Sequence, residues 1–154
     1  MEKNTIRFVQ EEDAEEILEI YKPYIKNTVI SFEYEIPSLE EFRTRIKKIS
    51  ADYPYIVYLE DDKIIGYAYA NRQKERAAYQ WNAELSIYIE QSHFRRGLGK
   101  ILYSALMDIS VLQNICNVYG VTTANNQNSE KLHEYLGFNK LGVYHHTGYK
   151  FVYY

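Results

Sequence analysis

Phe94-Arg95-Arg96-Gly97-Leu98-Gly99-Lys100 follows a strand-like stretch, Asn82 to Glu90, and opens a long amphipathic helix. Glycines in such a turn let backbone N–H groups approach an anion, and the N-terminus of the helix adds a partial positive charge. The cations of Arg95, Arg96 and Lys100 strengthen that field. The helix is predicted from apolar residues three and four positions apart: Leu98, Ile101, Leu102, Ala105, Leu106, Ile109 and Leu112. The stretch therefore predicts a phosphate-binding turn, although a basic turn that only connects two elements would read the same way.

Two common phosphate loops are excluded by single residues. A Walker loop needs glycine where Phe94 stands and serine or threonine where Ile101 stands. A dinucleotide-binding fingerprint needs glycine or alanine where Leu102 stands. The turn is therefore of neither kind.

Outward from this turn, apolar and aromatic runs predict a mixed sheet with helices on both faces. The predicted strands are Ile6 to Val9, Tyr55 to Leu59, Ile64 to Ala70, Asn82 to Glu90, Val118 to Thr123, Leu141 to Tyr144 and Tyr149 to Tyr154. Asp13 with Glu16 reads as a capping box for one helix, and Ser38 with Glu41 starts a second. A short helix is expected from Glu130 to Leu136. The fold class is α/β, with about six to seven strands in one domain.

Composition narrows the classes of function. A formal net charge of −3 without a long basic run argues against nucleic-acid binding. Cys116 is the one cysteine, and His145-His146 lacks further ligands, so we expect neither an internal disulfide nor a metal site. Neither a signal peptide nor a membrane-spanning run is recognisable, which predicts a cytoplasmic protein without a membrane partner. The 17 tyrosines suit half-buried strand positions, including strands beside a pocket.

The glycine turn resembles the acyl-CoA pyrophosphate loop of the GNAT superfamily of N-acetyltransferases, [Gln/Arg]-x-x-Gly-x-[Gly/Ala], with Phe94 departing from its first position. The chain is most similar to the phosphinothricin and methionine-sulfone acetyltransferase branch. The matching segments are Thr28-Val29-Ile30-Ser31-Phe32-Glu33, Tyr53-Pro54-Tyr55, Gly66-Tyr67-Ala68-Tyr69-Ala70, Arg76-Ala77-Ala78-Tyr79-Gln80-Trp81-Asn82-Ala83-Glu84, Tyr88-Ile89, Asn126-Gln127-Asn128-Ser129, Leu132-His133-Glu134-Tyr135-Leu136-Gly137-Phe138 and Gly148-Tyr149-Lys150. The branch usually continues with a longer final strand, whereas this chain reads Phe151-Val152-Tyr153-Tyr154. We therefore expect a single N-acetyltransferase domain over residues 1–154, with a shortened last strand.

The resemblance implies acetyl-CoA as co-substrate and direct attack of a free amine on the thioester. Glu84 is the expected general base, and His133 is expected to donate a proton or to orient the CoA sulfur. The expected cofactor-binding residues are Ile87, Tyr88, Ile89, Arg95, Arg96, Gly97, Leu98, Gly99, Lys100 and Asn126. A solvent-facing glutamate, a helix histidine without a role and a turn-forming asparagine remain the alternatives for Glu84, His133 and Asn126.

The acceptor implied by the resemblance is a small amino-acid-like amine such as phosphinothricin, methionine sulfone or methionine sulfoximine. Phe32, Glu33, Arg72, Arg76 and Tyr79 match the region that lines the acceptor site in related enzymes. An arginine there would bind a carboxylate or phosphinate, although a solvated basic loop is the alternative. A protein or peptide N-acetyltransferase and a non-catalytic CoA-binding module remain alternative functions. A homodimer is expected from the resemblance alone.

Overall fold

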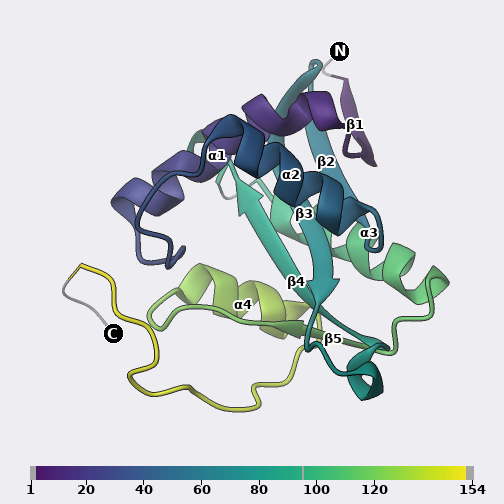
Figure 1. The fold of residues 1–154 in the computed structure, drawn as a ribbon, viewed down its shortest axis with the longest axis vertical. Helices are drawn as coiled ribbons and strands as arrows, with labels where there is room; N and C mark the ends of the chain where they lie inside the picture. The colour runs from purple at the N-terminus through teal and green to yellow at the C-terminus, as the bar shows by residue number, and fades with distance from the viewer. Residues whose placement is uncertain (1–2, 95, 152–154) are drawn as a thin grey trace.

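The computed structural model describes residues 3–94 and 96–151, which form one sheet flanked by helices (Figure 1). The strands are β1 (Asn4–Phe8), β2 (Tyr55–Glu60), β3 (Lys63–Arg72), β4 (Asn82–Ile89) and β5 (Asn117–Gly120). The helices are α1 (Ala14–Asn27), α2 (Leu39–Ser50), α3 (Leu98–Leu112) and α4 (Gln127–Tyr135), with short 3-10 turns η1 (Glu11–Asp13), η2 (Ala77–Tyr79) and η3 (Gln91–His93). In the described part of the chain, no helix is long and apolar enough to cross a bilayer.

The sheet follows the order of the sequence, β1-β2-β3-β4-β5. Neighbouring strands are antiparallel except β4 and β5, which run parallel because α3 crosses over between them. The predicted mixed sheet with helices on both faces is therefore confirmed.

Alternation along β3 divides the core into two layers. Tyr67 and Tyr69 face the layer under α1 and α2, whereas Ala68 and Ala70 face α3. The small residues let α3 lie close to the sheet, and a Cβ placed on Gly66 would be only 3.2 Å from Leu102 Cδ1. In Figure 1, α1 and α2 cross in front of the strands and α3 passes behind them.

The described residues contain five strands, fewer than the predicted six to seven. Residues 141–144 form no strand, and Leu141 and Tyr144 are 82% and 80% exposed. The pattern rule failed here because an apolar run becomes a strand only when a partner strand and a buried face are available. Of the last predicted strand, Lys150 makes an isolated bridge, and residues 152–154 lie outside the described part.

The two predicted helix starts had different outcomes. Ser38 Oγ accepts a hydrogen bond from the Glu41 backbone N–H at 3.1 Å, as predicted for an N-cap. The capping box of Asp13 and Glu16 is wrong. Asp13 belongs to η1, and its carboxylate binds the Arg7 guanidinium at 2.7 and 2.8 Å. Glu16 instead accepts from the Ile64 backbone N–H at 3.0 Å, which ties α1 to β3.

Replacing Leu102 by alanine tests whether α3 is anchored through this contact. Leu102 is 0% exposed, so Leu102→Ala should lower the free energy of unfolding by about 2–5 kcal/mol in urea titration. Its neighbour Ile101 is 44% exposed and provides the matched control, because Ile101→Ala should change the free energy of unfolding by less than about 1 kcal/mol. Equal losses in the two variants would contradict this packing.

Candidate active site

The two glycines at the start of α3 have different structural tasks. Gly97 is the N-cap residue and has a φ of 75°, a left-handed conformation that residues with a Cβ rarely adopt. A Cβ on Gly99 would be 3.0 Å from Leu132 Cδ2, so the absence of a side chain lets α4 pack against this turn. The first amides of α3 have no carbonyl partner within the helix and are available to an anion.

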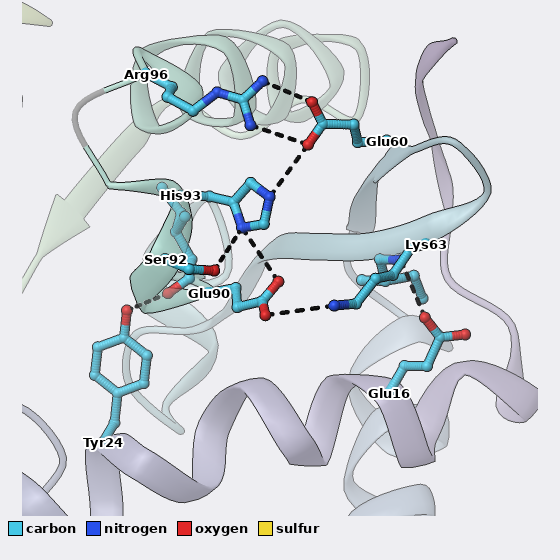
Figure 2. A network of polar contacts seen from close by, with 10 residues as sticks. Glu16, Tyr24, Glu60, Lys63, Glu90, Ser92, His93 and Arg96 are labelled. Carbon is cyan, nitrogen blue, oxygen red and sulfur yellow. Dashed lines mark hydrogen bonds and ion pairs between the residues drawn. The ribbon is translucent and has the colours of Figure 1, made fainter. Parts of the chain in front are cut away.

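Two of the three predicted cations, Arg96 and Lys100, already interact with protein groups. The Arg96 guanidinium binds the Glu60 carboxylate at 2.9 and 2.6 Å (Figure 2). Lys100 Nζ lies 3.7 Å from the centre of the Tyr135 ring. Arg95 lies outside the described residues. Among the described residues, the backbone amides at the start of α3 could therefore contribute to anion binding without giving up a contact to a side chain.

The parallel pairing of β4 with β5 ends in the middle of β4. It runs from Asn82 opposite Asn117 to Leu85 opposite Gly120. Residues 86–89 of β4 then continue without a partner strand on that side among the described residues. This stretch includes the predicted Ile87, Tyr88 and Ile89. Because strand N–H and C=O groups need partners, the open edge can hydrogen-bond an extended amide-containing ligand.

Glu84 lies one residue before the pairing of β4 with β5 ends. Alternation places it on the same face of β4 as Ser86 and Tyr88. The side chain is half-buried, and burial raises the pKa of the Glu84 carboxyl above its ordinary value. No ion pair to Glu84 occurs within the described ranges. A carboxylate with a raised pKa and no counter-ion suits a general base.

His133 on α4 lies against the end of β5. Its Nδ1 is 2.6 Å from the Ser129 carbonyl oxygen, which accepts a hydrogen bond from the protonated Nδ1. The other nitrogen, Nε2, is buried without a hydrogen-bond partner among the described residues. A Cβ placed on Gly120 would be 2.2 Å from this Nε2. In the neutral ring, Nε2 therefore presents a lone pair, and the ring can donate from it only when charged.

Asn126 and Leu98 each lie at the start of a helix, and the side chain of each contacts the protein itself. Asn126 is the N-cap of α4, and its side-chain oxygen accepts from the Ser129 N–H at 3.3 Å. The Leu98 side chain is buried between α3 and the sheet, so only its backbone can face a ligand at the start of α3. The turn-forming alternative for Asn126 is therefore realised in the protein's own hydrogen bonding.

The predicted acceptor residues fall into two groups. Phe32 and Glu33 lie in the connection between α1 and α2, where Glu33 pairs with Arg45 at 2.7 Å and also accepts from the Tyr21 hydroxyl. The Phe32 ring covers Gly148, where a Cβ would be 2.3 Å from Phe32 Cε2.

The second group lies on the connection between β3 and β4. Arg72 ends β3 and pairs with Glu75 at 3.4 Å, and Arg76 precedes η2. Lys74 Nζ lies 4.8 Å from the centre of the Tyr79 ring. Because Arg72 pairs in register with Ala83, this group is the one closer along the sheet to Glu84.

A tyrosine-lined cavity of about 50 Å³, which was not predicted from the sequence, lies under α2 on the Glu84 face of the sheet. Its lining residues are Tyr21, Phe42, Arg45, Ile46, Ile49, Tyr55, Tyr67, Tyr69 and Tyr88. Burial raises the pKa of Tyr69, whose phenol also feels the charges of Glu84, Glu33 and Arg45. The alternation Tyr67-Ala68-Tyr69-Ala70 could have predicted the cavity lining, because it places both tyrosines on one face of β3. Arg45 was not predicted, because the Glu33 carboxylate that it binds lies outside α2.

Comparisons with known proteins agree with this geometry. A family model described as "Acetyltransferase (GNAT) domain" matches residues 6–154. The phosphinothricin N-acetyltransferase of Alcaligenes faecalis is 34% identical over 152 residues, covering 96% of this chain and 76% of the relative. The L-methionine sulfoximine/L-methionine sulfone acetyltransferase of Salmonella typhimurium is 26% identical over 148 residues, with 96% and 86% covered. The crystal structure of a phosphinothricin acetyltransferase from Sinorhizobium meliloti in complex with acetyl-CoA superposes with a TM-score of 0.93 at 33% identity, covering 97% and 82% of the two chains.

The environment of Glu84 predicts a gain in stability when its charge is removed. Because burial raises its pKa, the folded chain binds this proton more tightly than the unfolded chain, and stability falls as the pH rises above the ordinary glutamate range. Glu84→Gln should therefore unfold at a higher temperature than the wild type at pH 7, and the difference should shrink towards pH 4. The same change at the exposed Glu35 provides the control. A Glu84→Gln variant that is less stable at pH 7 would refute this description of the site.

Proposed function

The chain belongs to the GNAT acetyltransferase domain family and is an acetyl-CoA-dependent N-acetyltransferase, and we propose that Glu84 activates the amine of a small amino-acid-like acceptor. Phosphinothricin, methionine sulfone and methionine sulfoximine are the acceptors named for its relatives. The observation that carries the proposal is a half-buried carboxylate with a raised pKa where β4 and β5 part.

The residues on both sides of this point fit acetyl-CoA. The α3 amides after Gly97 would hold the diphosphate, with Arg95, Arg96 and Lys100 adding positive charge. The β4 edge at 86–89 would bond the amides of the pantetheine arm. Asn126, which caps α4, would contribute a contact beside this arm.

Glu84 would take a proton from the acceptor ammonium, directly or through a water molecule. The free amine then attacks the thioester carbonyl, and an N–H of the β4 edge would stabilise the oxyanion that develops there. The carbon–sulfur bond breaks, and the departing thiolate would take up the second proton of the attacking nitrogen, which leaves a neutral amide and the CoA thiol. His133 Nε2, buried without a partner in the described structure, would orient that sulfur at the end of β5.

The acceptor would lie on the Glu84 face of the sheet. Alternation along β3 places Arg72 on the face of Ala68 and Ala70, away from Glu84. Arg76, which precedes η2 with Tyr79 beside it, would therefore bind the carboxylate or phosphinate of the acceptor through charge-assisted hydrogen bonds. The tyrosines that line the cavity under α2 would contact the side chain of the acceptor. Phe32 and Glu33 would close this site from the α1–α2 connection.

The proposal includes a cytoplasmic location and a homodimer. Both rest on resemblance to the family, and size-exclusion chromatography with light scattering would test the dimer.

The assay of purified protein with acetyl-CoA and a panel of amines tests this function. We expect thiol release with phosphinothricin, methionine sulfone or methionine sulfoximine, and Glu84→Gln should lower kcat by about 10²- to 10⁴-fold. CoA binding by the variant should remain within about twofold of the wild type, because the base does not hold the diphosphate.

Other results would favour the alternative functions. A lower KM for peptides than for free amino acids would indicate a peptide acetyltransferase. Stabilisation by CoA without thiol release from any amine would indicate a binding module.

A further inference from the structure

The segment between β4 and α3 joins the two halves of the cofactor site. β4 ends at Ile89 and α3 begins at Leu98, and η3 (Gln91–His93) lies between them. One half of the proposed site is the β4 edge, and the other half is the N-terminus of α3. The path of this segment therefore sets the distance between the groups that would bind the pantetheine arm and the diphosphate.

Ionic contacts fasten this segment to the β2–β3 hairpin, as Figure 2 shows. Glu60, the last residue of β2, binds both terminal nitrogens of Arg96 at 2.9 and 2.6 Å. The same carboxylate lies 3.2 Å from His93 Nε2. At the beginning of the segment, Glu90 Oε1 lies 3.4 Å from Lys63 Nζ, and the Glu90 backbone N–H donates to the Ile65 carbonyl at 2.9 Å. The hairpin thus holds the segment at its beginning, middle and end.

His93 lies between two carboxylates in this network. Its Nδ1 is 3.2 Å from Glu90 Oε2 and 3.0 Å from Ser92 Oγ, and its Nε2 faces Glu60. Glu90 Oε2 is buried and accepts no hydrogen bond from the described residues unless the His93 ring donates to it. Only the doubly protonated ring can donate to both carboxylates at once.

We propose that Glu60 is a positioning residue for acetyl-CoA, because its two-pronged pair with Arg96 fixes the turn that presents the α3 amides to the diphosphate. The inference rests on the proposed function. The negative charge of the Glu60 carboxylate by itself repels a phosphate group. Glu60 can therefore favour CoA binding only by holding the turn in the right conformation. The Glu60 side chain is 14% exposed, and the hydrogen bonds from Arg96 lower the pKa of its carboxyl, so the pair is intact at neutral pH.

Isothermal titration with CoA at pH 7 tests the proposal in four proteins: the wild type, Glu60→Gln, Arg96→Gln and the double variant. Glu60→Gln should weaken CoA binding about tenfold. With saturating acetyl-CoA, its kcat and its acceptor KM should stay within about twofold of the wild type, because only the diphosphate turn has changed. In the Arg96→Gln background, Glu60→Gln should add little, because the two residues act as one unit.

The control is Glu19→Gln, which removes the same charge from an exposed ion pair with Lys22 on α1. It should leave CoA binding unchanged. Tighter or unchanged CoA binding in a folded Glu60→Gln variant would overturn the proposal, because Glu60 would then only compete with phosphate for Arg96. Should Glu60→Gln fail to fold, Arg96→Lys keeps the charge but cannot form the fork, and unchanged CoA binding in Arg96→Lys would be equally contrary. A folded wild type that gives no heat with CoA would instead refute the proposed function itself.

Discussion

The parting of β4 from β5 is the constraint on which the rest of the molecule depends. A parallel ladder of four residue pairs holds the two strands together and stops at Leu85 and Gly120. Beyond that point, the backbone groups of β4 that would have bonded β5 need another partner. α3 and α4 enclose this opening on one side of the sheet, while α1 and α2 cover the opposite face. In the proposed function, the cofactor and the acceptor would thus approach β4 from opposite faces of the sheet, and Glu84 would lie where they meet.

An acidic protein can bind an anionic nucleotide when local dipoles outweigh its net charge. The formal charge here is −3, and Arg96 and Lys100 are both engaged with protein groups. The amides at the start of α3 carry their partial charges at any pH, and the turn fixes their direction. In the proposed site, Arg96 and Lys100 would serve partly to shape the turn, so the number of basic residues would underestimate its affinity for an anion.

The sequence predicted those elements that depend on residues a few positions apart. It did not predict features that depend on a partner residue far away in the chain. Helix α3 follows from its apolar spacing, and the Ser38 cap follows from a contact three residues away. Asp13 could not be assigned in this way, because its strongest partner, Arg7, comes from a neighbouring strand. The strand predicted from Leu141 to Tyr144 is absent for a similar reason, because a strand needs a second strand to pair with and none lies beside this segment in the described structure. At the site, the glycine turn and Glu84 came from motif and resemblance. Arg45 was missed because its significance comes from Glu33, which the chain brings to it across the α1–α2 connection.

Gly120 gives the His133 ring its place, and this has a consequence for how the protein can diverge. Even the smallest side chain at residue 120 would occupy the space of Nε2. Alanine at residue 120 therefore requires either a shorter residue at 133 or rotation of the His133 ring out of its place. A smaller residue at 133, by contrast, leaves glycine at 120 tolerated.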